Sequence, residues 1–186
     1  MPIPIPIYES FEEPEPGKVF TGYNLIEGNP LRRKSFLEIK NDEQIRVMVS
    51  QLVSFLSAMH SISGDSASRE LQLEAHHPRE DMRDLYEKFQ HKLFPFMSKE
   101  SQISVTESFE DFLKEVALAN LDLALIHGDF GASNILWNSG TGEISGIIDF
   151  GGAGIGDTAY DFAGLLSSYG ENFFIGVLIN IRTVKK

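Results

Sequence analysis

A histidine, an aspartate and an asparagine share one short polar stretch between two apolar runs, in the segment LIHGDFGASNIL (residues 125–136). His127, Asp129 and Asn134 give the pattern H-x-D-x-x-x-x-N, and a D-F-G sequence follows at residues 149–151. In phosphoryl transfer, an aspartate on such a loop accepts the proton of the attacking hydroxyl. An asparagine five residues on and the D-F-G aspartate hold Mg²⁺. The spacing therefore predicts metal-assisted phosphoryl transfer.

Each of these motifs is a weak signal by itself, because aspartate and asparagine also form turns and cap the ends of strands. The two motifs in order, each behind a predicted strand, are a much stronger signal. A base and a metal ligand on one tight loop reach the nucleophile and the phosphates together. A carboxylate from the neighbouring hairpin then approaches the metal from another side. We therefore prefer a functional interpretation of the two motifs.

The elements that must position these residues follow from the hydrophobic pattern. Apolar side chains recur at helical spacing behind capping residues or a proline, which predicts helices over residues 42–61, 78–94, 105–119 and 156–170. Runs rich in β-branched and aromatic residues predict strands over residues 18–26, 121–126, 135–137 and 143–150. The tail from residue 175 has no clear period. Short strands thus bracket the polar loop, and a Gly-rich turn joins the last two strands.

The composition of the chain disfavours some classes of binding partner. The formal net charge of -11 argues against nucleic acid or an anionic membrane, and it favours a small cationic partner. The absence of cysteine excludes disulfides, thiolate metal sites and a cysteine nucleophile. The first residues lack the basic and apolar regions of a secretion signal, and no run of apolar residues is long enough to span a membrane. We expect a cytoplasmic protein.

Two segments resemble a known family. Over residues 123–166 the sequence resembles the aminoglycoside phosphotransferase and choline kinase-like superfamily, where the loop reads H-G-D and a G-D-P-A-x-D-L-A segment follows the metal aspartate. FTGYNLIEGNPL, which begins at Phe20, resembles the strand and hinge between the two lobes of the aminoglycoside 2″-phosphotransferases. The resemblance implies an α+β, protein-kinase-like fold that is mainly the helical C-terminal lobe, with a small β-hairpin bearing the metal site. Residues 1–30 would be a remnant of an otherwise absent N-terminal lobe, and residues 31–186 a C-terminal lobe with incomplete terminal helices.

The resemblance also implies a role for each matching residue. Asp129 would be the catalytic base, and Asn134 and Asp149 the Mg²⁺ ligands. His127 and Asp161 would brace the loop through hydrogen bonds without taking part in the chemistry.

The nucleotide site is implied in the same way. The backbone at Asn24 and Ile26 would anchor the base of ATP or GTP, and Leu136 and Ile148 would form an apolar floor beneath it. The implied reaction moves the γ-phosphate of either nucleotide to a hydroxyl of an aminoglycoside-like molecule. A kinase for another small amine alcohol, such as choline, is an alternative within the same fold.

The sequence lacks two parts that the family uses to cover and neutralise the triphosphate, a Gly-rich loop and a strand lysine ahead of the hinge. No G-x-G-x-x-G occurs, and Lys18, the sole lysine ahead of the hinge, lies in the strand next to it. A catalytically incompetent fragment, or a binding or interaction module, is therefore the alternative from a different class. Exposed apolar surface where a second lobe would pack predicts self-association. A dinuclear hydrolase is disfavoured because too few histidines accompany the later carboxylate.

Overall fold

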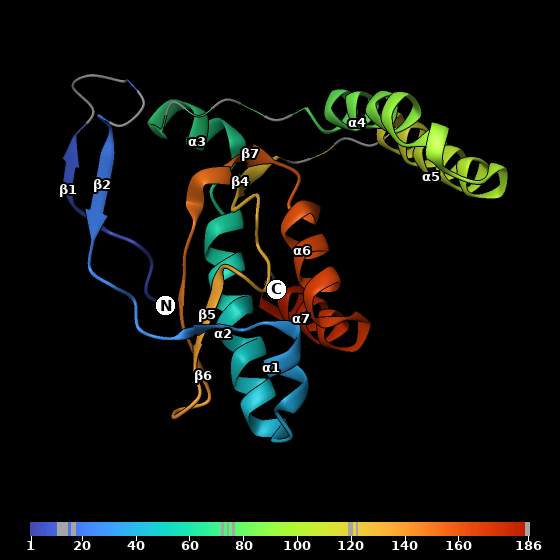
Figure 1. The fold of residues 1–186 in the computed structure, drawn as a ribbon. Coiled ribbons are helices and arrows are strands. Elements are labelled where there is room, and N and C mark those ends of the chain that lie inside the picture. The colour runs from blue at the N-terminus through green and yellow to red at the C-terminus, as the bar shows by residue number, and fades with distance from the viewer. Residues whose placement is uncertain are drawn as a thin grey trace. The chain divides into compact units, whose positions relative to one another are not determined.

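The computed structural model describes residues 1–10, 15, 18–71, 73, 75, 77–118, 121 and 123–184. Its helices and short antiparallel strands form an α+β fold, as predicted (Figure 1). The chain forms two compact units. The first contains residues 1–59, 127–153 and 159–186, and the second contains residues 60–126 and 154–158. The division at residue 30 remains a prediction.

Helices supply most of the core of the first unit, which contains α1 (Arg33–Glu38), α2 (Asp42–His60, to Met59), α6 (Ala159–Tyr169) and α7 (Glu171–Val184). Asn41 caps α2, because its Oδ1 accepts the Glu43 N–H at 2.9 Å. One face of α2 is buried against the other elements, and removing this apolar area from water stabilises the unit. The core side chains at this centre are Leu31, Met48, Leu52, Leu56, Phe130, Ile135, Ile147, Leu165, Phe173 and Val177.

A three-stranded antiparallel sheet carries the predicted hairpin. Strand β5 (Ile135–Asn138) lies between β3 (Asn29–Pro30) and β6 (Glu143–Ile147). In the register of the sheet, Leu136 of β5 lies opposite Pro30 of β3, and Ile135 of β5 lies opposite Ile147 of β6. The turn between β5 and β6 closes where the Gly142 N–H donates to the Asn138 carbonyl at 2.8 Å. A separate two-stranded sheet joins β1 (Pro6–Ser10) to β2 (Phe20–Tyr23).

The second unit is mainly helical. It contains α3 (Gly64–Leu71), α4 (Pro78–Lys92), a 3₁₀ turn η1 (Phe94–Phe96), α5 (Lys99–Leu118), and the strand pair β4 (Ala124–Ile126) and β7 (Gly154–Gly156). Helices α4 and α5 pack through aromatic rings: Tyr86 stacks on Phe109 with ring centroids 4.8 Å apart, and Phe89 lies 5.4 Å from the same ring.

The predicted elements are largely present, with shifted ends. The strand predicted over 18–26 is shorter and covers Phe20–Tyr23, while the helix predicted from residue 105 begins six residues earlier, at Lys99. Residue 119, the predicted end of that helix, lies outside the described residues. The tail without a clear period forms most of α7. Among the described helices, none is both long enough and apolar enough to cross a membrane.

Candidate active site

One face of α6 holds the loop that begins at His127. Asp161 is fully buried, and its two carboxylate oxygens accept the backbone N–H groups of His127 and Gly128, each at 3.0 Å. Ser168 lies seven positions further along the helix, and its Oγ accepts the Ala132 N–H at 3.0 Å. Positions three and seven residues apart share a helix face. The loop is therefore fixed at both ends by side chains of a single helix.

Gly164 completes this face of α6 between Asp161 and Ser168. A Cβ at Gly164 would overlap the carbonyl oxygen of Phe130, so a larger residue would push the helix off the loop. Sequence reasoning assigned a bracing role to Asp161 but missed Gly164 and Ser168. The signal for them was their spacing of three and seven residues from Asp161.

Asp129 and Asn134 are brought together, as the motif predicts. The Asn134 side-chain nitrogen donates to the Asp129 carbonyl at 2.8 Å and to its carboxylate Oδ2 at 2.9 Å. Both partners are acceptors, which fixes the amide orientation and turns the Asn134 Oδ1 away from them. Asn134 is 5% exposed, whereas the Asp129 side chain is exposed. A buried amide thus orients a solvent-facing carboxylate.

Asp149 lies two residues beyond the end of β6, the strand that pairs with β5. The Ile148 N–H donates to the Asn134 carbonyl at 3.0 Å, so the backbone of Asn134 lies beside the residue that precedes Asp149. Asp149 adopts φ 65° and ψ 66°, and among the described residues it is the one non-glycine residue with positive φ. This left-handed conformation costs about 1–2 kcal/mol for most residues. Such strain is typical of functional positions.

Two glycines let the loop approach the segment after Asp149. Gly128 has φ 78°, and a Cβ placed on it would overlap the carbonyl oxygen of Gly152. Gly152 follows Asp149 within the 3₁₀ turn η2 (Phe150–Gly152). Backbone contact at this point requires the absence of a side chain. The two motifs recognised in the sequence are therefore packed directly against each other.

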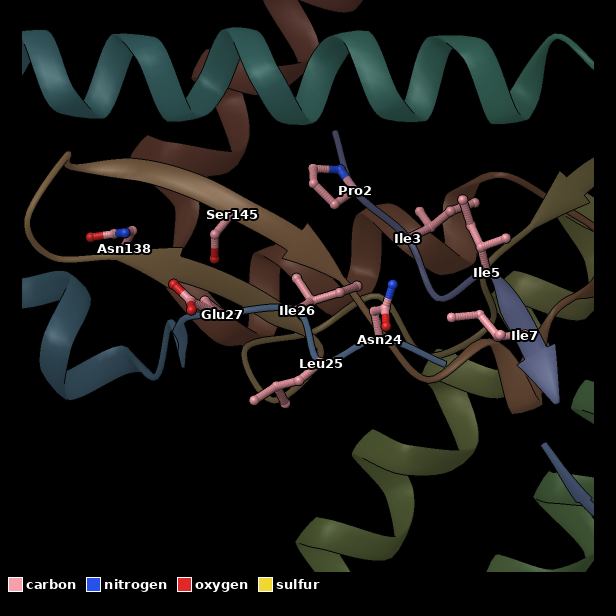
Figure 2. Close-up of a pocket in the computed structure, with 10 residues that line it drawn as sticks. All are labelled: Pro2, Ile3, Ile5, Ile7, Asn24, Leu25, Ile26, Glu27, Asn138 and Ser145. Carbon is pink, nitrogen blue, oxygen red and sulfur yellow. The ribbon is translucent and has the colours of Figure 1, made fainter. Parts of the chain in front are cut away.

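The predicted nucleotide anchors line a hollow of about 550 Å³ in the first unit (Figure 2). Asn24 and Ile26 form part of its wall together with apolar residues of the N-terminal stretch, and Ser145 of β6 points toward Glu27. Leu136 is buried on β5, opposite Pro30, and Ile148 is half-buried beyond the end of β6. Neither is among the residues that line this hollow. The predicted base anchors thus line one hollow, whereas the predicted floor residues lie outside its lining, Leu136 on β5 and Ile148 just past the end of β6.

The donor set near the loop suits a hard cation. Asn134 Oδ1 and the Asp149 carboxylate are oxygen donors, the ligand type that Mg²⁺ takes in proteins. Among the described residues, no group of three or more His, Asp or Glu side chains gathers to hold a metal by itself. Mg²⁺ is commonly held by one or two protein ligands together with substrate phosphates. The residues present therefore fit a metal that binds with a nucleotide.

An α+β fold with this loop and hairpin defines a class, the kinase-like phosphotransferases. The Phosphotransferase enzyme family matches residues 1–182 of the chain. Viomycin phosphotransferase of Streptomyces vinaceus is 31% identical over 143 residues, which cover 75% of this chain and 48% of that protein. The chain belongs to the phosphotransferase enzyme family.

Solved structures with the same fold include the GDP and kanamycin complex of APH(2")-IIia. Its TM-score is 0.86 at 24% identity, over 97% of this chain and 60% of that one. A macrolide 2'-phosphotransferase from Brachybacterium faecium has a TM-score of 0.67 at 17% identity, over 98% of this chain and 58% of that one. The chain thus has the kinase-like fold of these proteins and spans about half to three-fifths of the relatives' length.

Proposed function

We propose that this protein transfers the γ-phosphate of ATP or GTP to a hydroxyl of an aminoglycoside-like small molecule. Asp129 would accept the proton of that hydroxyl, and Asn134 and Asp149 would hold Mg²⁺. The observation that carries the proposal is the bonded arrangement of these residues: Asn134 donates to Asp129 through its side chain and accepts from Ile148 through its backbone. One residue thereby connects the proposed base with the proposed metal aspartate.

Mg²⁺ bound with the nucleotide would neutralise charge on the phosphates during transfer. The chain's own residues supply the rest. The exposed Asp129 carboxylate is oriented by a buried amide, so it is positioned before a substrate arrives. Three backbone N–H groups of the loop donate to Asp161 and Ser168 of α6, and these bonds support the loop geometry that proton transfer requires.

The hollow beside the hinge supports nucleotide binding there. Ser145 Oγ is buried and lacks a hydrogen-bond partner within the described structure, and such a group is costly unless a partner satisfies it. Ser145 lines the same hollow as Asn24 and Ile26. We propose that the Ser145 side chain rotates into the hollow when nucleotide binds, so that its hydroxyl pairs with a polar atom of the nucleotide. The reaction would take place in the cytoplasm, the compartment that supplies ATP and GTP.

The proposed acceptor is a polyamine sugar. The formal charge of -11 and the exposed carboxylates of Asp129 and Asp149 favour a cationic substrate over an anionic one. Among the related proteins, one is a viomycin phosphotransferase and one was solved with GDP and kanamycin. Kanamycin and viomycin are therefore the first acceptors to test, with choline as the small amine alcohol for comparison.

Calorimetric titration of the chain with Mg-ATP and Mg-GTP tests binding, and mass spectrometry of the three acceptors tests transfer. Asp149→Asn should abolish binding of the metal–nucleotide complex. Asp129→Asn should leave that binding intact and lower the rate of transfer by about 10²–10⁴-fold, the usual contribution of a general base. Asp42→Asn removes an exposed charge at the start of α2 and serves as the matched control.

A parent chain that neither binds nucleotide nor transfers phosphate would overturn the proposal and favour an interaction module. If the Asp149→Asn variant still binds the metal–nucleotide complex, Asp149 is not a ligand of the proposed metal. Transfer to choline in preference to both antibiotics would keep the reaction and change the substrate class.

A further inference from the structure

Strand β6 contains one residue more than the stretch of β5 that it faces. Ile144 lies opposite Trp137 of β5, whereas the residue two positions further along β6, Gly146, lies opposite the adjacent Leu136. Ser145 is therefore left without a counterpart on β5. An extra residue of this kind is a β-bulge, which bends its strand and redirects a side chain, often next to a functional site. The position of the bulge thus decides where the Ser145 side chain lies.

A glutamine of α2 binds the residue directly before the bulge. Gln51 Oε1 accepts the Ile144 N–H at 2.9 Å, and Gln51 Nε2 lies 3.5 Å from the Ile144 carbonyl oxygen. The first contact has the ordinary length of a hydrogen bond, and the second is long. Because the Ile144 N–H donates to α2, it faces the edge of β6 that no described strand covers. Gln51 thus takes the place of a neighbouring strand at this point.

The contact between α2 and the hairpin extends to the turn. Gln44 lies two helical turns before Gln51 on the same face of α2, and a Cβ on Gly142 would overlap the Gln44 amide. Ile144 is 4% exposed and belongs to the core that α2 helps to form. A shift of β6 by one residue would turn Ile144 to the other face of the sheet. Side-chain amides and core packing therefore favour the same register.

The bulge places Ser145 at the wall of the hollow. Its Oγ is buried and has no hydrogen-bond partner within the described structure, and the residue lines the hollow with Asn24 and Ile26 (Figure 2). A Cβ on Gly28 would overlap this Oγ, so the serine side chain lies directly against the backbone that follows the predicted base anchors. A displacement of the bulge would carry the hydroxyl away from that backbone.

We propose that Gln51 is a positioning residue, which fixes the β-bulge at Ser145 by binding Ile144 and thereby sets the affinity for nucleotide. The effect on affinity rests on the proposed function, in which the Ser145 hydroxyl pairs with the nucleotide. The position of the bulge does not, and it can be measured on the chain without any nucleotide.

Three substitutions of Gln51 separate hydrogen bonding from packing. Gln51→Glu keeps an oxygen for the Ile144 N–H. Gln51→Met has a similar length and lacks both amide groups, and Gln51→Ala gives the same loss with a smaller side chain if methionine prevents folding. Gln102→Met is the matched control, because Gln102 Nε2 donates to the carbonyls of Phe94 and Met97 in the second unit, at 2.7 and 3.1 Å.

Nuclear magnetic resonance without nucleotide gives the first readout. In the parent chain we expect a nuclear Overhauser effect between the α-protons of Trp137 and Ile144, because the two residues lie opposite each other and the Ile144 N–H points away from β5. Exchange of the Ile144 amide hydrogen should be slow in the parent and in Gln51→Glu, and faster in Gln51→Met and Gln51→Ala. The Ile147 amide, which donates to the Pro2 carbonyl at 3.1 Å, is the internal reference.

Nucleotide affinity gives the second readout. Titration with Mg-ATP and Mg-GTP should show an affinity about 3- to 10-fold lower in Gln51→Met, the usual effect of losing one hydrogen bond. Gln51→Glu and Gln102→Met should stay within about twofold of the parent. In a Ser145→Ala background, Gln51→Met should have no further effect on affinity, because the hydroxyl that it positions is absent. A role in packing alone would leave Gln51→Met close to the parent.

Four results would overturn the inference. Two concern the chain alone: a Trp137 α-proton that contacts Ser145 in place of Ile144, and an Ile144 amide that exchanges equally fast in the parent and in Gln51→Met. The others are an unchanged affinity in Gln51→Met, and losses that simply add in the double variant with Ser145→Ala. If the parent chain binds no nucleotide, the proposed function fails, and the register and the amide exchange still decide whether Gln51 fixes the bulge.

Discussion

The Asn134 amide nitrogen donates twice to Asp129, to the backbone oxygen at 2.8 Å and to carboxylate Oδ2 at 2.9 Å. Backbone and side chain of the proposed base are thus held by one neighbour. Asn134→Ala should lower the free energy of unfolding by about 1–3 kcal/mol, the usual cost of leaving a buried polar group without its partner. Urea unfolding measures the change.

Asn134→Asp provides a sharper test of the same contact. It places a second carboxylate against Asp129, and like charges at this distance repel. We expect a larger loss than for Asn134→Ala at pH 7, and a partial recovery when the pH is lowered and the pair shares a proton. Asn138→Asp is the control, because Asn138 Oδ1 acts as an acceptor for the Gly140 N–H and an aspartate keeps that role. Equal stability of Asn134→Asp and the parent would contradict the assigned orientation.

Asp161 should contribute more to the free energy of unfolding than Ser168 does. Asp161→Ala leaves the backbone N–H groups of His127 and Gly128 without partners. We therefore expect the free energy of unfolding to fall by about 2–5 kcal/mol. Ser168→Ala removes one hydrogen bond and should cost about 1 kcal/mol. Asp161→Asn keeps one acceptor oxygen and should fall between them. Denaturant midpoints that rank these variants in another order would argue against Asp161 as the anchor of the loop.

Replacement of three glycines by alanine should change the stability of the fold by different amounts. Gly128→Ala combines a left-handed φ with a clash against Gly152 and should be the most destabilising. Gly170 has φ 85° and open space around it, so Gly170→Ala should cost about 1 kcal/mol from backbone strain alone. Gly176 lies inside α7, also with open space, and Gly176→Ala should stabilise by about 0.5–1 kcal/mol. Thermal unfolding of the three variants checks the order.

Burial raises the pKa of the Tyr169 hydroxyl, which donates to the Leu31 carbonyl at 2.9 Å. A tyrosine in the unfolded chain ionises near pH 10, so the folded state binds one more proton than the unfolded state above that value. The contribution of Tyr169 to stability is therefore complete below pH 10, and it is lost as the pH rises toward the folded pKa. Its slope is about 1.4 kcal/mol per pH unit.

Tyr169→Phe isolates that contribution. The difference in unfolding free energy between parent and variant should be constant up to about pH 10 and then shrink. Tyr8→Phe is the control, since the Tyr8 side chain is 70% exposed. A difference that does not change between pH 9 and pH 11 would mean that Tyr169 is not held neutral in the folded state.

The β1–β2 hairpin and its continuation expose several large apolar side chains, among them Ile5 at 70%, Phe20 at 59% and Leu25 at 88%. An exposed apolar sheet face promotes association. We expect the average mass from light scattering to rise with protein concentration, and the double variant Ile5→Lys with Leu25→Lys to suppress the rise. Leu37→Lys, at an exposed position of α1, is the control. A concentration-independent monomer would contradict this prediction.

The sequence predicts α2 well because its capping residue, length and apolar period all agree. The same holds for the β5–β6 hairpin, whose turn residues lie between two apolar runs. The structure brings the loop residues together, since Asn134 is bonded to Asp129 and lies beside the chain that enters Asp149, and their catalytic and metal-binding roles stay a prediction. Local signals and tertiary packing point the same way at these positions.

Helix α7 could not be predicted because apolar residues occur on all its sides. Phe173, Val177 and Ile181 are buried at helical spacing, yet Ile175 and Ile179 between them are exposed and obscure the period. The burial of Phe173 against Phe36 and Tyr169, with ring centroids 4.9 and 5.1 Å apart, selects one face. Strand β7 has three residues with glycine, which is depleted in strands, at both ends, so its pairing with β4 depends on tertiary contacts. Such contacts are not visible in a local pattern.

The hydrogen bond from Tyr169 to Leu31 joins residues 138 positions apart in the chain. Contacts that close long loops form slowly, because the chain must first lose the entropy of bringing distant segments together. The core of the first unit cannot be completed on a ribosome until α6 has emerged. Until then the buried faces of α1 and α2 have no partner from the later chain, and they are a natural target for chaperones during synthesis.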